Sequence, residues 1–212
     1  MTRPLPAHQA RSRETRDRIV AALERLLKDR PFEQISVAEI AREAGISVGG
    51  VYRRFANKDA LIPVLFELYT QRLAAFEAEA AGRANVEPAA GLRDTLHQAM
   101  QTAWGQIQAP GHLLRAVYLY ARIRPDLVGE GWEDLIERSR SSIRTLLSEF
   151  AREITIDDDE AGVEALTYFF NTILIEQGLF AEIGPQLGEV LAGDRLAREM
   201  ADFAYGYLTM PR

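Results

Sequence analysis

One short segment of this sequence contains side chains whose types and spacing suit the recognition of a nucleic acid. Tyr52, Arg53 and Arg54 follow one another, while Val51 and Phe55 lie four residues apart and are expected to turn inward. The tyrosine and the two arginines are then left on or beside the outer face. Arginine binds guanine edges and phosphates, and a short helix that presents such side chains fits the major groove of DNA.

Two short predicted helices position these side chains. Ser36 and Glu39 form a capping-box pair, which satisfies backbone donors where a helix begins. Gly45 can adopt the left-handed conformation that ends a helix, and Ser47 can cap the helix that follows. The spacing predicts a helix-turn-helix motif. The alternative, an ordinary helical hairpin with a surface arginine pair, does not account for the caps and the basic surroundings together.

The charge of the chain is divided unevenly. The net charge of −6 by itself argues against a nucleic-acid ligand. However, residues 1–58 contain 12 Lys and Arg against 7 Asp and Glu, whereas residues 59–212 contain 13 against 24. A basic head on an acidic body fits a protein of which only the head approaches phosphates. We therefore expect a DNA-binding domain at 1–58, with a basic N-terminal arm at 1–13, and a second domain at 59–212.

The sequence predicts an all-α fold, because no segment shows the two-residue period of a strand. The first helix is expected over 14–29. Asn57 should cap a long helix over 58–80 that links the two domains, and Pro63 should kink this helix. The helices predicted for the second domain span residues 88–108, 111–123, 131–153, 158–183 and 191–209.

The last two predicted helices are unusually apolar. The helix over 161–180 is apolar around much of its circumference, and such a helix needs partners on two sides. We therefore predict an interface between two copies of the chain. The residues expected there are Phe169, Ile173, Phe180, Met200, Phe203 and Tyr207.

No combination of residues indicates catalysis or metal binding. Cysteine is absent, and the three histidines include no Glu-x-x-His pair, which argues against zinc and di-iron sites. The acidic run 157–160 suits the start of a helix and lacks the spacing of a calcium loop. We expect no catalytic residue, no metal and no cofactor, and hence no enzyme. The alternative is a helical-bundle enzyme or small-molecule carrier with an incidental helix-turn-helix.

The apolar segments are too short for a membrane. The longest, over 166–175, contains Asn171 and stops at Glu176. The N-terminal residues lack the apolar run of a secretory signal. We therefore expect a cytoplasmic protein with no membrane partner.

Residues 14–68 resemble the head of TetR-family transcriptional regulators. The resemblance rests on two runs, Ser36-Val37-x-x-Ile40-Ala41-x-x-Ala44-Gly45-Ile46-Ser47 and Gly49-x-Val51-Tyr52-x-x-Phe55-x-Asn57-Lys58-x-x-Leu61. It implies a homodimer whose heads bind a palindromic operator in double-stranded DNA. It also implies that each body holds a pocket for a small-molecule effector. The last two helices of each copy would together form a four-helix bundle in the dimer. Members of this family are most often repressors, which implies here a repressor that its effector releases from DNA.

The resemblance further implies which residues contact DNA. Ser36, Tyr52 and Lys58 match positions that bind phosphates, and Arg53 matches a position that contacts bases or the backbone. Gly50 departs from the family, which usually has Ser or Thr there. Adjacent glycines also weaken a helix by about 1 kcal/mol each relative to alanine. The full predicted set is Ser36, Ser47, Val48, Gly49, Gly50, Tyr52, Arg53, Arg54 and Lys58.

Polar and aromatic side chains in the second domain are candidates for the effector pocket. Tyr118 and Arg122, four residues apart, would present hydrogen-bonding groups from one helix face. Asn171, on an otherwise apolar helix, needs a buried partner, another subunit or a ligand. Aromatic residues here either line the pocket or fill the core. The candidates are Trp104, Tyr118, Arg122, Tyr168 and Asn171.

Overall fold

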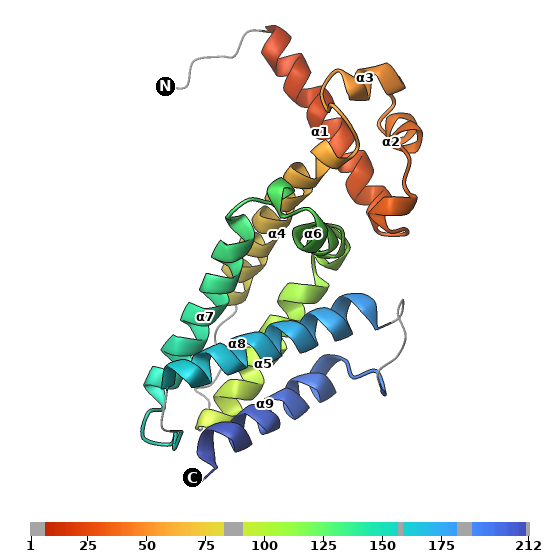
Figure 1. The fold of residues 1–212 in the computed structure, drawn as a ribbon. Helices are drawn as coiled ribbons and strands as arrows, with labels where there is room; N and C mark the ends of the chain where they lie inside the picture. The colour runs from red at the N-terminus through yellow and green to blue at the C-terminus, as the bar shows by residue number, and fades with distance from the viewer. Residues whose placement is uncertain (1–6, 83–90, 157–158, 182–187, 211–212) are drawn as a thin grey trace. The chain divides into compact units, whose positions relative to one another are not determined.

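The computed structural model describes residues 7–82, 91–156, 159–181 and 188–210, and within these ranges it contains helices and no strands (Figure 1). The predicted all-α fold is therefore confirmed. No helix in the described ranges is long and apolar enough to cross a membrane. The elements are α1 (Ala7–Leu27), η1 (Phe32–Gln34), α2 (Val37–Glu43), α3 (Val48–Tyr52), η2 (Asp59–Leu61), α4 (Ile62–Gly82), α5 (Leu92–Gln108), α6 (Gly111–Ile123), η3 (Pro125–Leu127), α7 (Gly131–Glu149), α8 (Asp159–Ile175), the π turn η4 (Glu176–Phe180) and α9 (Gly193–Thr209).

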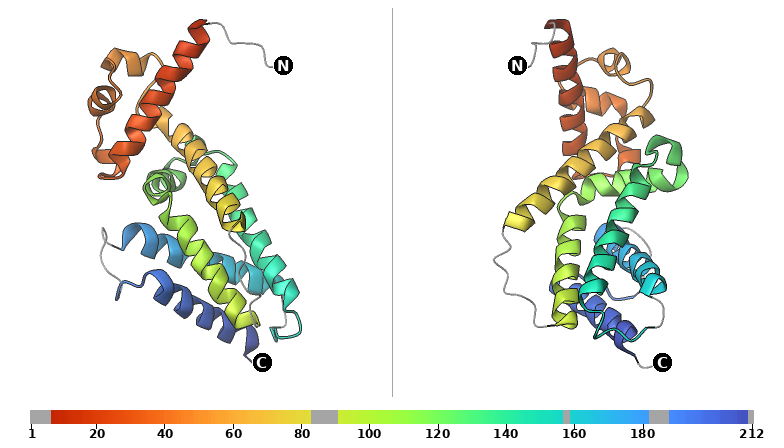
Figure 2. Two further views of the ribbon diagram at one scale, coloured as in Figure 1. Left: turned by 180° about the vertical axis from the view of Figure 1, so that it is seen from behind. Right: turned by 90° about the vertical axis from the view of Figure 1, so that its left-hand side faces the viewer.

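The contacts between these elements divide the chain into two compact units. The head unit consists of residues up to 71 together with 112–129, so that α6 belongs with α1, α2 and α3. The body unit consists of residues 72–111 and 130–212. In the body unit α9 runs alongside α5, as both views in Figure 2 show, and α7 packs on α8.

Local capping interactions define the two short helices of the head unit. The Ser36 hydroxyl accepts a hydrogen bond from the Glu39 N–H at 3.2 Å, and the Glu39 carboxylate accepts one from the Ser36 N–H at 2.9 Å. Gly45 has a φ of +65°. The Ser47 hydroxyl accepts a hydrogen bond from the Gly50 N–H at 3.1 Å. The predicted capping box, left-handed turn and second cap are all confirmed.

Burial of apolar side chains holds the short helices against α1. Ile19 and Leu23 of α1 and Ile40 of α2 are fully buried. Val51 and Phe55 are 1% and 6% exposed, so the prediction that both turn inward is confirmed. Transfer of each such side chain from water into the core contributes on the order of 2 kcal/mol to the stability of the fold. The opposite face of α3 is thereby turned to solvent.

The first helix begins earlier than predicted. α1 starts at Ala7, so residues 7–13 of the predicted arm are helical, and residues 1–6 lie outside the described residues. The apolar stripe of α1 starts only at Ile19, and its first turn has no acidic residue. Neither sign of a helix start is therefore present near residue 7.

The predicted kink at Pro63 has no cause in this structure. Asn57 Oδ1 accepts a hydrogen bond from the Ala60 N–H at 2.9 Å, and so caps the 3₁₀ turn η2. α4 begins only at Ile62, which places Pro63 in its first turn. A backbone N–H has no intrahelical partner there, so proline removes no hydrogen bond of the helix.

The body unit has an apolar core around the α5–α9 pair. Leu92, Leu96 and Met100 of α5 pack with residues of α9, among them Met200, which is 4% exposed. Met200, predicted to lie in a subunit interface, fills this core with its side chain instead of facing solvent. Several helix ends also differ from the prediction: α7 ends at Glu149 rather than 153, and η4 interrupts the helix predicted to run to 183. The predicted ends at 88, 158 and 183 lie outside the described residues.

The capping box should make the stability of the head unit depend on acid pH. The hydrogen bonds that Glu39 accepts from Ser36, and then that from Arg30, lower its pKa from 4.5 to about 2. Because the folded pKa is the lower one, the stabilisation is complete above pH 4.5 and is lost as pH falls toward 2. Glu39→Ala should therefore lower the melting temperature at pH 7, and its difference from wild type should shrink as the pH falls below about 4.5. Thermal unfolding against pH tests this, with the exposed Glu14→Ala as control; a difference that stays constant down to about pH 2.5 contradicts it.

Candidate nucleic-acid interface

The exposed side of α3 and its two caps form one continuous surface. Val48 and Tyr52, four residues apart, are 40% and 52% exposed. Gly49 and Arg53 follow them at the same helical spacing and are also exposed, and Ser47 lies at the N-cap. We call these five residues the recognition surface. The structure thus brings five of the predicted DNA-contacting residues together on one side of the head unit.

The two adjacent glycines of α3 lie in different surroundings. A Cβ atom added at Gly49 would meet nothing within 4 Å. Gly50 is buried, and a Cβ atom there would lie 3.4 Å from the Ser47 hydroxyl, an ordinary contact. The Gly50 N–H is also occupied by that hydroxyl. Of the pair, Gly49 is the one placed to approach a ligand, whereas Gly50 lies beneath the recognition surface.

Arg54 points toward α1 rather than along the recognition surface. Its Nη1 donates to the Gly50 carbonyl at 3.2 Å, and its Nε donates to the Ser12 carbonyl at 3.4 Å. Both partners are neutral, so the guanidinium keeps its charge while joining the end of α3 to α1. The sequence indicates the residue type but not this contact, because Ser12 is 42 residues away.

Lys58 is also bonded within the head unit. Its Nζ donates to the carbonyls of Phe32 at 2.5 Å and Glu33 at 3.2 Å, and it lies 4.4 Å from the centroid of the Phe32 ring. Burial lowers the pKa of the ammonium group below its usual value. Lys58 therefore ties η1 to the start of the 3₁₀ turn η2, which precedes α4. Its contact with a phosphate stays a prediction, as does that of Ser36, which is exposed at the start of α2.

Cations on the two units differ in their partners. In the body unit, arginines form ion pairs with carboxylates, for example Arg93 with Asp202 at 2.6 Å and Arg144 with Glu160 at 2.7 Å. In the head unit, exposed cations that make no ion pair with any described residue are numerous. They are Arg11, Arg13, Arg18, Lys28, Arg42, Arg53 and Arg122. Unpaired cations of this kind leave a positive field available to phosphates.

The predicted pocket residues belong to both units. Tyr118 and Arg122 belong to the head unit, where the Arg122 guanidinium donates to the Tyr118 hydroxyl at 2.8 Å. In the body unit, Trp104 packs against the core, and the Asn171 amide donates to Thr167 O at 2.8 Å and Ser139 Oγ at 3.1 Å. The intrahelical and α7 contacts of Asn171 account for its place on an apolar helix without a ligand.

Two of the predicted interface residues, Phe169 of α8 and Phe203 of α9, belong to an exposed aromatic row. Phe169 and Phe203 are 42% and 57% exposed, and their ring centroids lie 5.9 Å apart. Tyr168, predicted to line a pocket, is instead 69% exposed and stacks edge-on against Phe169. The remaining predicted members, Ile173, Phe180 and Tyr207, are half-buried.

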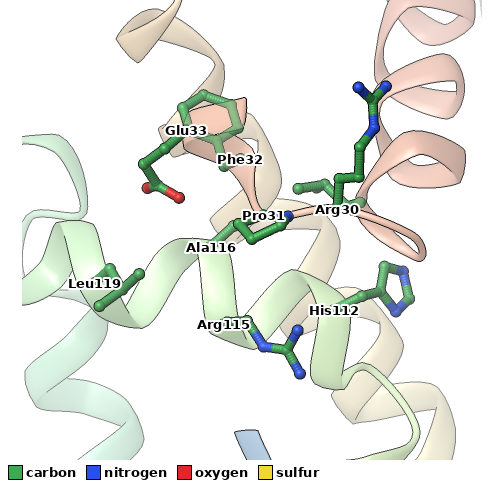
Figure 3. Close-up of a pocket in the computed structure, with 9 residues that line it drawn as sticks. Arg30, Pro31, Phe32, Glu33, His112, Arg115, Ala116 and Leu119 are labelled. Atoms are coloured by element: carbon green, nitrogen blue, oxygen red, sulfur yellow. The ribbon is translucent and has the colours of Figure 1, made fainter. Parts of the chain in front are cut away.

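A small cavity in the head unit lies between the turn after α1 and helix α6. Figure 3 shows Arg30, Pro31, Phe32 and Glu33 of the turn over His112, Arg115, Ala116 and Leu119 of α6. Its volume of about 10 Å³ holds roughly one water molecule, so it does not accommodate an organic effector. Across the described ranges, no group of three or more His, Asp or Glu side chains could hold a metal ion.

Comparison with known proteins shows a likeness over part of the head unit. Residues 19–64 match the sequence profile described as bacterial regulatory proteins, tetR family. No curated protein matches the chain by sequence.

Solved structures with the same fold include several regulators. PfmR, a TetR-family transcriptional regulator from Thermus thermophilus, is 18% identical with a TM-score of 0.61, over 92% of this chain and 100% of that one. The transcriptional regulator FadR from Bacillus subtilis, solved with stearoyl-CoA, is 16% identical with a TM-score of 0.60, over 89% and 96%. NalD, the secondary repressor of the MexAB-OprM multidrug efflux pump in Pseudomonas aeruginosa, is 19% identical with a TM-score of 0.51, over 95% and 98%. At these identities the likeness shows a shared fold.

Replacing each of the two glycines separately tests which one faces the ligand. Gly49→Ala and Gly50→Ala should each stabilise α3, by up to about 1 kcal/mol, because alanine favours a helix. Only Gly49→Ala places a methyl group on the recognition surface, so it alone should weaken DNA binding. Thermal unfolding and gel-shift titration measure the two effects. The assignment fails if Gly50→Ala weakens DNA binding as much as Gly49→Ala does.

Proposed function

We propose that this protein, whose residues 19–64 match the tetR family of bacterial regulatory proteins, acts as a ligand-released repressor. In this proposal a homodimer binds a palindromic operator in double-stranded DNA in the cytoplasm, and a small-molecule effector releases it. The family is regulatory rather than enzymatic. The matched segment contains α2, α3 and the turn between them, so the proposal places the function in the head unit.

The observation that carries the proposal is the recognition surface together with the unpaired cations of the head unit. A short helix that presents Tyr52 and Arg53 to solvent fits a major groove, where an arginine can bind the O6 and N7 atoms of guanine. Exposed cations without acidic partners suit the phosphates on either side of that groove. We assign base contacts to Arg53, and phosphate contacts to Ser36, Tyr52 and Lys58.

The aromatic row on α8 and α9 supports a homodimer. Phe169 and Phe203 leave a large apolar area exposed to water, which a second copy would cover. A two-fold dimer presents two heads, and two half-sites about 34–36 Å apart correspond to one turn of DNA. The palindromic operator in the proposal follows from this symmetry.

We further propose that a small-molecule effector controls DNA binding. FadR from Bacillus subtilis is described in complex with stearoyl-CoA, and NalD is described as a repressor. By analogy we propose a small-molecule effector that binds the chain and favours a head spacing unsuited to DNA. A typical coupling of this kind is about 1–3 kcal/mol. A thermal-shift screen of hydrophobic metabolites and drugs would identify the effector, because a ligand of the folded state raises its stability.

A gel-shift titration with the DNA that flanks the chain's own gene tests DNA reading. Wild type should bind this DNA more tightly than random DNA, and the affinity should fall steeply with salt. Arg53→Ala should reduce the preference by roughly 1–3 kcal/mol, the usual value of one bidentate base contact. Lys28→Ala, which removes an exposed cation just after the C-terminal end of α1, is the control and should leave the preference unchanged. If wild type does not discriminate between the two DNAs, a helical-bundle enzyme or carrier becomes the better account.

The dimer is tested by placing a charge in the aromatic row. Phe203→Glu should shift the protein from dimer to monomer, because an interfacial carboxylate would be buried without a partner. Ile123→Glu replaces another exposed apolar residue, 69% exposed in the head unit, and should leave the dimer intact. Light scattering after gel filtration gives the mass of each variant. A dimeric Phe203→Glu protein would contradict the proposed interface.

A further inference from the structure

We propose that the N-terminal part of α1, residues 7–18, is a second DNA-contacting element and that Arg54 holds it beside the recognition surface. The proposal rests on the proposed function and adds an element that lies outside the helix-turn-helix. The ligand in question is the sugar–phosphate backbone of double-stranded DNA, which carries one charge per phosphate.

Arg54 joins the end of α3 to this part of α1. Carbonyls in the last turn of a helix have no intrahelical partner, and the Gly50 carbonyl accepts a hydrogen bond from Arg54 Nη1 at 3.2 Å. The Nε of the same guanidinium donates to the Ser12 carbonyl at 3.4 Å. Figures 1 and 2 both show α3 beside the N-terminal half of α1. One rigid, planar side chain therefore fixes the two elements relative to each other.

Three arginines lie along one side of α1. Arg11, Arg18 and Arg25 are spaced seven residues apart, which corresponds to about two helical turns per step. Arg25 identifies the direction of this row, because its Nε donates to the Glu43 carboxylate of α2 at 2.7 Å. The row therefore lies on the side of α1 that carries the helix-turn-helix.

The first two arginines of the row are available to a ligand. Arg11 and Arg18 are exposed and make no ion pair with any described residue, unlike Arg25. Arg13 lies about 200° around the helix from Arg11. It falls toward the side on which Arg16 pairs with Glu67 of α4 at 3.2 Å. Arg11 and Arg18 thus differ from Arg13 in the side of α1 on which they lie, and from Arg25 in making no ion pair with a described residue.

An element of this kind contributes affinity without reading bases. Contacts to phosphates fix the position of a protein on the duplex, and each one lowers the slope of log K against log salt by about 0.9. Two additional contacts would extend the neutralised backbone beyond the groove that α3 occupies. They would change affinity for operator and random DNA alike.

The salt dependence of binding tests the two arginines. The double variant Arg11→Gln/Arg18→Gln should reduce the steepness of the log–log slope by about 1.8, the value for two phosphate contacts. The ratio of affinities for flanking and random DNA should stay as in wild type. Arg13→Gln, on the other side of the same turn, and Lys28→Gln, at the other end of α1, are matched controls and should change the slope by less than half as much.

Hydrogen exchange tests the positioning role of Arg54 without DNA. In the free protein, Arg54→Gln should increase the exchange rates of the backbone amides of residues 11–14 several-fold. Arg53→Gln, one residue away and without a contact to α1, should leave them unchanged. Equal exchange in both variants would overturn the positioning role.

The outcomes separate this inference from the proposed function. If wild type shows no salt-dependent affinity for any DNA, the proposed function itself fails. If wild type binds with a steep salt dependence and the double variant has the same slope as Arg13→Gln, only the second element is refuted.

Discussion

The surface proposed to read DNA depends on the left-handed backbone turn at Gly45. Its φ of +65° ends α2, and a Cβ atom there would meet nothing within 4 Å. The requirement is therefore one of backbone conformation, which costs other residues about 1–2 kcal/mol, rather than one of space. The turn is closed by the hydrogen bond from the Ile46 N–H to the Ala41 carbonyl at 3.0 Å. Because of this turn, Ser47 caps α3 only two residues after Gly45. In that orientation of α3, Val51 is buried and Tyr52 is exposed to solvent.

Electrostatics then distinguishes the two units. In the body unit most described arginines pair with carboxylates, which leaves little unpaired positive charge on a unit that is acidic as a whole. In the head unit, Lys58 and Arg54 donate to backbone carbonyls, which stabilise the fold without neutralising the charge. The same cations can therefore fix the positions of helices and contribute to a positive field. This dual use explains how a chain with a net charge of −6 can present a basic surface.

The sequence predicted those features that depend on neighbours a few residues away. The caps at Ser36 and the turn at Gly45 are set by local hydrogen bonds and local backbone strain, so the helix-turn-helix could be placed correctly. Features set by distant residues were missed. The carbonyls that bind Lys58 lie in a turn 25 and 26 residues earlier, and Met200 faces its own core because α5 packs there. The predicted helix start at residue 58, and with it the kink at Pro63, was wrong because a 3₁₀ turn precedes α4. Hydrophobic periodicity does not reveal such a turn.

Hydroxyl-radical footprinting of wild-type protein on the DNA that flanks its gene tests the central claim most directly. That claim is that two preformed heads, carried by one dimer, read one operator. It predicts two protected patches of backbone whose centres lie about one helical turn, roughly 10 base pairs, or a whole multiple of it apart. The two patches should appear together as protein is added. Protection spread evenly along the fragment, or a single patch at saturating protein, would contradict the account.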